Sequence, residues 1–182
     1  MTDLHLVLRE EDSAFQCALA RSKTGTLGHI GTHFDCYTPP PESDHFSLPA
    51  LVLDCSGGMP GLDACKTLPS LAGKALILRT ANEETNGYTS PAYFAKETFL
   101  PEHCLIEILD RKPAFIVIDS HGIGPSGEIH TRRDKICEAY GRHVIENANL
   151  APPLAGKRET QLEIFVDVDN PSTGKPCKLI CP

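Results

Sequence analysis

The order of a few short apolar runs constrains the fold of this chain most strongly. Residues 50–54, 74–80 and 115–119 are each of strand length and rich in Leu, Ile or Val, as in strands buried on both faces. The segment 101–111, between the last two runs, has apolar residues at helical spacing. A strand, helix, strand order implies a right-handed crossover between parallel strands. The chain is therefore expected to be an α/β protein with a partly parallel sheet.

Periodicity and the positions of Pro and Gly assign the other elements. Further strands are expected at residues 4–8, 144–147, 159–168 and 178–181. Additional helices are expected at residues 10–21 and 135–140. Loops are expected at 37–46, 82–90 and 120–133.

The composition is that of an ordinary globular domain. With 182 residues, 41% of them hydrophobic, the chain is long enough for one core, and we expect a single domain over residues 1–182. A net charge of −7 argues against nucleic acid or an anionic membrane as the main partner. No leader and no membrane-spanning run is visible. The eight cysteines form no C-x-x-C pair, which fits reduced thiols in a cytoplasmic protein.

The segment His29-Ile-Gly-Thr-His33-Phe-Asp35 concentrates chemistry in a few residues. Two imidazoles and a carboxylate are ligands that Zn²⁺ and Mn²⁺ accept. His33 and Asp35 are two residues apart, so an extended backbone points them to the same side. Gly31 allows a turn that brings His29 to them. The alternative is a polar turn with one buried, hydrogen-bonded histidine.

Other polar residues follow the later strands. Asp119 and His121 come at and after the end of an apolar run, where α/β folds place functional side chains; a turn or helix cap explains Asp119 equally well. His130 is expected in a polar loop, with Asp134 four residues later. Glu146 follows two β-branched residues, and a carboxylate on such a buried segment needs a partner, of which a metal is one.

Several other chemistries have no signature. The sequence contains no G-x-S-x-G elbow, no P-loop and no dinucleotide-binding glycine motif after a strand. A thiol-dependent reaction at Cys36 stays open, since this residue directly follows Asp35.

With these residues in place, the chain resembles the metal-dependent cyclase family, which includes bacterial kynurenine formamidase and isatin hydrolase. Residues 29–35 match the first half of the family pattern His-x-Gly-Thr-His-x-Asp-x-Pro-x-His. Tyr37 and Pro39 stand where the pattern has Pro and its last His. Further similar segments occur in family order at 76–80, 115–120, 144–150 and 174–179.

The resemblance implies a fold, a site and an activity. The fold would be α/β, of the swivelling β/β/α type, with mixed sheets, flanking helices and a homodimeric assembly. The metal ligands would be His29, His33, Asp35, Glu146 and a more distal residue, for which we favour His130 over Asp134. The missing motif His would be replaced by His45, returned to the site by the proline-rich insertion, or otherwise by His121, with Asp35 also taking part in catalysis.

The function expected from the resemblance is hydrolysis of a small-molecule amide, similar to that of an arylformamidase or a cyclic amidase. Zn²⁺ or Mn²⁺ would activate a water for attack on the carbonyl. The alternative is a catalytically degenerate relative that binds a metal or a small molecule, because the motif is broken at Tyr37 and Pro39.

Overall fold

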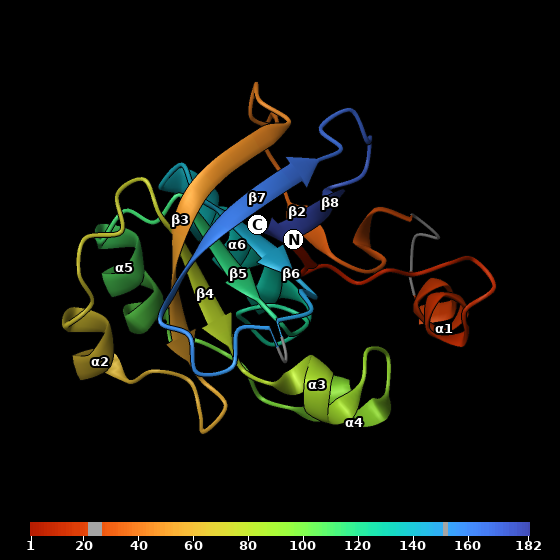
Figure 1. Ribbon diagram of the computed structural model, residues 1–182, viewed down its shortest axis with the longest axis horizontal. Helices are drawn as coiled ribbons and strands as arrows, with labels where there is room; N and C mark the ends of the chain where they lie inside the picture. The colour runs from red at the N-terminus through yellow and green to blue at the C-terminus, as the bar shows by residue number, and fades with distance from the viewer. Residues whose placement is uncertain (22–26, 151–152) are drawn as a thin grey trace.

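The computed structural model describes residues 1–21, 27–150 and 153–182. Within these ranges, eight strands form one mixed sheet in the order β1-β8-β2-β6-β5-β4-β3-β7 (Figure 1). Its parallel part consists of β3 (His45–Asp54), β4 (Ala75–Arg79), β5 (Phe115–Ile118) and β6 (His143–Glu146). The expected α/β class, with a mixed sheet and flanking helices, is confirmed.

The remaining strands run antiparallel to their neighbours and close the sheet. They are β1 (Thr2–Asp3), β2 (His33–Asp35), β7 (Glu159–Val166) and β8 (Gly174–Cys181). β7 pairs with β3 on one side and with β8 on the other, so the sheet curls round until its two ends meet. This closure leaves an enclosed interior that side chains must fill.

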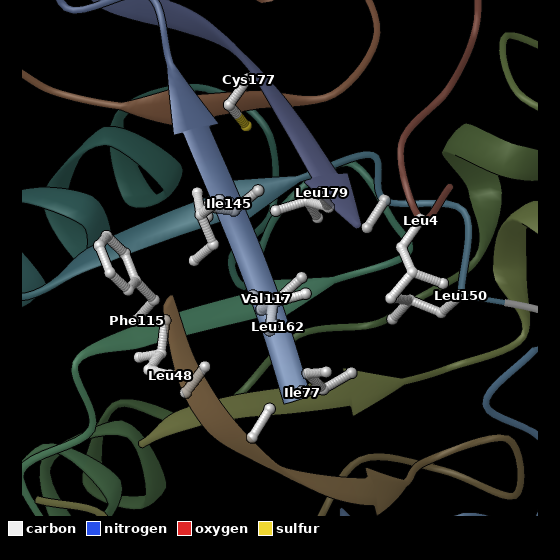
Figure 2. Close-up of a cluster of buried hydrophobic side chains, with 14 of the residues drawn as sticks. Leu4, Leu48, Ile77, Phe115, Val117, Ile145, Leu150, Leu162, Cys177 and Leu179 are labelled. Carbon is white, nitrogen blue, oxygen red and sulfur yellow. The ribbon is translucent and has the colours of Figure 1, made fainter. Parts of the chain in front are cut away.

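The interior holds one of two apolar cores. Alternate residues of β3, such as Leu48 and Ala50, point inward and meet Leu162 and Ile164 of β7. Figure 2 shows Leu48, Leu162 and other buried side chains of this core, with β7 and β8 in front and the parallel strands behind. Phe34 of β2 belongs to the same buried cluster, and this fixes which face of β2 is left for its polar residues.

The second core lies on the outer face of the parallel strands. Leu76 and Leu78 of β4 pack there with Leu105 and Ile108, which belong to α5 (Glu102–Asp110). The short helix α2 (Leu62–Lys66) packs beside α5. Because β4 is buried on both faces, its sequence is continuously apolar rather than alternating.

The other helices correct several expectations. The expected loop 120–133 contains the start of α6 (Glu128–Ala139), and the loop 82–90 contains α3 (Asn82–Asn86), which is followed by α4 (Pro91–Ala95). The expected proline-rich loop 37–46 ends in a strand, because β3 begins at His45. The expected strand 4–8 is wrong: only His5 makes an isolated bridge there.

The last points of the fold concern α1 (Ser13–Arg21) and the length of the helices. The helix α1 lies on the opposite side of the molecule from α2 and α5 (Figure 1). None of the helices in the described ranges is both long and apolar enough to cross a membrane.

Candidate metal centre

The outer face of β2 and β6 carries the first part of a polar cluster. Since Phe34 points into the core, His33 and Asp35 project from the opposite face of β2. His33 lies directly opposite Glu146 of β6 in the antiparallel register. The imidazole Nε2 of His33 is 3.7 Å from Asp35 Oδ1 and 3.7 Å from Glu146 Oε2. Strand pairing therefore joins the motif to a carboxylate more than a hundred residues later.

The helix α6 supplies the second part. His130 and Asp134 are one turn apart, so both project from the same face of the helix. The Nε2 atom of His130 is 3.4 Å from Asp134 Oδ2 and 3.4 Å from Glu146 Oε1. The expectation that His130 lies in a loop is wrong. The cluster contains both His130 and Asp134, so the structure offers both as candidate ligands.

His29 reaches the cluster from the 3₁₀ turn Leu27–His29. Its Nε2 atom is 3.6 Å from Asp35 Oδ1, and its side chain is 38% exposed, whereas Asp35 is buried. The turn packs tightly against β8, since a Cβ at Gly174 would lie 2.7 Å from the His29 ring. His29 thus forms the solvent-facing rim of the cluster.

The buried carboxylates of the cluster lack hydrogen-bond partners. Among the described residues, five carboxylate oxygens of the cluster are buried without a hydrogen-bond partner: both of Asp35, both of Asp134 and Oε1 of Glu146. Burial raises the pKa of Asp35 to about 7. Burial, and then the charge of Asp35, raises the pKa of Asp134 to about 7. Burial and these two charges raise the pKa of Glu146 well above its usual value. Such a group of anions costs free energy unless a cation joins it.

The candidate ligand atoms form two overlapping groups that share Asp35. One contains His29, His33 and Asp35, and the other contains Asp35, His130, Asp134 and Glu146; the atoms within each group lie within 4.8 Å of one another. Burial lowers the pKa of His33 to about 4, so its ring is neutral, as a metal ligand must be. The unpartnered oxygens and the neutral imidazole of His33 suit a borderline divalent metal.

A third group, next to the first two, is held differently. Cys36, Glu138 and His143 also lie within 4.8 Å of one another. Glu138 Oε1 accepts hydrogen bonds from the backbone N–H groups of Tyr37, at 2.5 Å, and Thr38. Cys36 Sγ donates to the Thr38 carbonyl. These atoms already have partners, so the group ties the chain after β2 to α6.

The structure does not bring His45 to the cluster. The ring lies on the outer face of β3, where Nε2 is 2.7 Å from Glu163 Oε2 and the imidazole stacks on Phe165. Both partners belong to β7, and β7 and β8 separate β3 from β2 in the closed sheet. The proline-rich insertion therefore leads into a strand rather than returning His45 to the motif.

His121 is buried beside aromatic rings, just before a glycine that touches the cluster. Its ring centroid lies 5.5 Å from that of Phe94 and 5.9 Å from that of Phe99. Burial lowers the pKa of His121 to about 4. A Cβ on Gly122 would lie 2.5 Å from Glu146 Oε1 and would also collide with the His130 ring. The segment after β5 thus forms one wall of the cluster.

Asp119 has a structural role. Its carboxylate accepts hydrogen bonds from the backbone N–H and hydroxyl of Thr80 and from the N–H of Ala81. These bonds anchor the chain between β4 and α3, as the turn explanation of this residue predicts.

A cavity of about 650 Å³ borders the segment between His29 and His33, at Ile30, Gly31 and Thr32, but does not coincide with the cluster. It is apolar, is lined by residues such as Leu8, Phe15 and Phe165, and includes none of the described candidate ligands.

Comparison with known proteins gives matches by structure. No protein-family model and no curated protein matches the sequence. Two solved structures, a potential metal-dependent hydrolase with cyclase activity and a predicted metal-dependent hydrolase from Bacillus stearothermophilus, each align with a TM-score of 0.71 at 16% identity, over 99% of this chain and 96% of theirs. An isatin hydrolase bound to the product analogue thioisatinate aligns with a TM-score of 0.61 at 18% identity, over 86% of this chain and 74% of that one.

The chain shares the fold of these proteins. At such low identity the likeness extends to architecture and does not by itself transfer an activity. The polar cluster on β2, β6 and α6 provides separate evidence about chemistry.

Proposed function

We propose that this protein is a metal-dependent hydrolase of a small-molecule amide. The observation that carries the proposal is the set of buried, unpartnered carboxylate oxygens on Asp35, Asp134 and Glu146, faced by neutral imidazole. Buried charges in proteins are paired with other groups or coordinate metals. The fold shared with metal-dependent hydrolases and an isatin hydrolase supports the same assignment.

The ligands of the proposed centre are His29, His33, Asp35, His130, Asp134 and Glu146. Asp35 belongs to both groups of donor atoms, so it would be a ligand whichever of the two groups held the metal. When bound, Zn²⁺ or Mn²⁺ would activate a water and polarise the amide carbonyl. The buried side of the centre, formed by Asp134 and Glu146, excludes bulk water, whereas the half-exposed His29 marks the open side.

His121 takes the place of His45 in the proposed mechanism. Ser120 Oγ accepts hydrogen bonds from Asn82 Nδ2 and Thr98 Oγ1, which leaves the hydroxyl proton of Ser120 for Nδ1 of His121, 3.3 Å away. His121 then carries its own proton on Nε2. In this form it would donate a hydrogen bond to the leaving nitrogen or to the developing oxyanion.

The proposed substrates are N-formyl arylamines and cyclic amides. Phe94 and Phe99 are partly exposed beside His121 and offer apolar surface for an aromatic group. Tyr93 is not available for this, because it is fully buried and its hydroxyl is bonded to Asn147.

A homodimer is part of the proposal. Val7, Leu27 and Phe165 are large exposed apolar residues, and all three line the apolar cavity. An exposed apolar surface of this kind is typical of an interface, and sedimentation of the purified protein would give the assembly state.

A metal- or small-molecule-binding protein without turnover is the second candidate. Pro39 replaces the last motif His, and His45 is engaged by Glu163 on the outer face of the sheet. If His121 cannot serve in its place, the cluster would bind metal without hydrolysis.

Elemental analysis and a substrate screen separate these functions. Untagged protein, purified without chelators, should contain one or two equivalents of Zn or Mn, and His33→Ala and His130→Ala should each lose metal. Hydrolysis of an aryl formamide or a cyclic amide by the loaded protein supports the enzyme. Metal without turnover favours the binding protein, and no metal even after adding Zn²⁺ or Mn²⁺ would refute both forms of the metal site.

A further inference from the structure

The peptide group of Gly31 is held from several sides. Its N–H donates to the Tyr88 hydroxyl at 2.8 Å. Its carbonyl oxygen lies 2.9 Å from Nδ1 of His33 and 3.1 Å from Nδ2 of Asn147. Gly31 adopts a φ of 72°, a conformation in which a residue with a side chain is strained. The turn before β2 is thus fixed by contacts from distant segments.

The carbonyl of Gly31 decides which nitrogen of His33 carries the proton. A carbonyl oxygen only accepts hydrogen bonds, so Nδ1 of His33, at 2.9 Å, is the donor. The Asn147 Nδ2 atom lies 3.4 Å from Nδ1 but closer, at 3.1 Å, to the carbonyl oxygen, to which it also donates. The lone pair is then on Nε2, which faces Asp35 Oδ1 and Glu146 Oε2 at 3.7 Å each. This is the tautomer in which His33 can bind a metal from the side of the carboxylates.

Asn147 and Tyr93 hold this carbonyl in place. The hydroxyl of Tyr93 donates to Asn147 Oδ1 at 2.6 Å, which directs the NH₂ group of Asn147 to Gly31. The opposite orientation of the amide would set Oδ1 against the Gly31 oxygen, two acceptors facing each other. The backbone of Asn147 is itself fixed, since its carbonyl accepts from Thr32 Oγ1. Tyr93, Asn147 and His33 are all buried.

We propose that Asn147, oriented by Tyr93, is a positioning residue that holds metal ligand His33 in its binding tautomer through the Gly31 carbonyl. The inference rests on the proposed function in treating His33 as a ligand. It assigns Tyr93 to the support of the metal centre rather than to substrate contact.

Two variants remove the contacts one at a time. Asn147→Gly deletes the amide and suits the left-handed backbone at this position, where φ is 54°. Tyr93→Phe deletes only the hydroxyl that orients the amide. The matched control is Thr98→Val, which removes another buried hydroxyl, bonded to Ser120 Oγ at 2.7 Å, in the same layer.

Cobalt binding and histidine NMR provide the readouts. Co²⁺ affinity, measured by visible absorption, should fall by about 10–100-fold in Asn147→Gly and by a smaller factor in Tyr93→Phe, and should change less than twofold in Thr98→Val. In metal-free, ¹⁵N-histidine-labelled protein, the ring shifts of His33 should report Nδ1–H in the wild type. Asn147→Gly should move these shifts towards those of a free imidazole, in which the Nδ1–H and Nε2–H tautomers are mixed. The His33 signal is identified as the one that is missing from the spectrum of His33→Ala.

The outcomes separate this inference from the proposed function. Cobalt affinities of both variants within twofold of the control, or a tautomer unchanged in Asn147→Gly, would overturn the positioning role. If the wild type binds no Co²⁺, Zn²⁺ or Mn²⁺, the proposed function fails, and the NMR comparison in metal-free protein still decides whether Asn147 orients His33.

Discussion

His33 and Glu146 face each other across two antiparallel strands, with Nε2 of the imidazole 3.7 Å from Oε2 of the carboxylate. This pairing is the link between the motif at the start of the chain and the helix α6. Glu146 Oε1 lies 3.4 Å from His130 on that helix. Glu146, like Asp35, therefore joins the candidate ligands of β2 to those of α6.

The close approach of Gly122 to this carboxylate gives a steric test. Gly122→Ala would place a methyl group 2.5 Å from Glu146 Oε1 and against the ring of His130. Since both side chains must move, Zn²⁺ affinity should fall at least about tenfold, as when the support of a ligand is lost. Isothermal titration of the chelator-treated protein measures it.

Gly127→Ala is the matched control. Gly127 also has a left-handed φ, of 104°, but a Cβ there meets nothing within 4 Å. Both variants should lose about 1–3 kcal/mol of stability through backbone strain, and only Gly122→Ala should lose metal affinity. Equal affinities would show that the wall at Gly122 does not shape the site.

Asp134 predicts a pH dependence in the metal-free protein. Its pKa is raised from 3.8 to about 7 by burial and by the charge of Asp35. Between these values the folded state keeps a proton that the unfolded state has released, so this group makes stability fall as the pH rises from about 4 to about 7. Asp134→Asn removes the effect, and its stability relative to wild type should increase over that window.

Urea unfolding with a chelator present, at pH 4.5 and pH 7.5, measures this difference. Asp110→Asn, at an exposed position at the end of α5, is the control and should show no such trend. If the free energies of unfolding of Asp134→Asn and wild type differ by the same amount at both pH values, the raised pKa of Asp134 is contradicted.

The position of His45 predicts that it is dispensable. Its ring pairs with Glu163 and stacks on Phe165 at the surface, where solvent screens the pair and leaves it little effect on stability. His45→Ala should change metal content and turnover less than twofold. His121→Ala, in contrast, should lower turnover by at least about a hundredfold with metal content unchanged, the low end of the loss when a donor to a developing oxyanion is removed. The reverse pattern would return His45 to the mechanism.

The thiols give a further test. Cys36 is buried, and burial raises the pKa of its thiol, so it is a poor nucleophile. Cys17 is the exposed cysteine of the described chain. Brief treatment of native protein with iodoacetamide should modify Cys17 and leave Cys36 and turnover intact, as peptide mass mapping would show. Loss of activity together with labelling of Cys36 would favour the thiol-dependent reaction instead.

Local patterns were sufficient for part of the fold and part of the site. The apolar runs at 74–80 and 115–119 predicted strands β4 and β5 because burial on both faces leaves a continuous apolar signal. His29, His33 and Asp35 lie close in sequence, so a short turn and a strand bring them together. By contrast, α6 was predicted only from 135 onward, since its exposed, polar first turns carry little apolar periodicity.

Residue type and spacing thus determined the α/β class and the first three members of the cluster. Tertiary structure decided the rest: strand register set Glu146 opposite His33, the start of α6 brought both His130 and Asp134 in, and the pairing of β3 with β7 carried His45 away. The support of His33 by Tyr93 and Asn147 also depends on side chains 54 residues apart in sequence. Such contacts follow from the closure of the sheet and the packing of a helix on it, and no local sequence pattern encodes them.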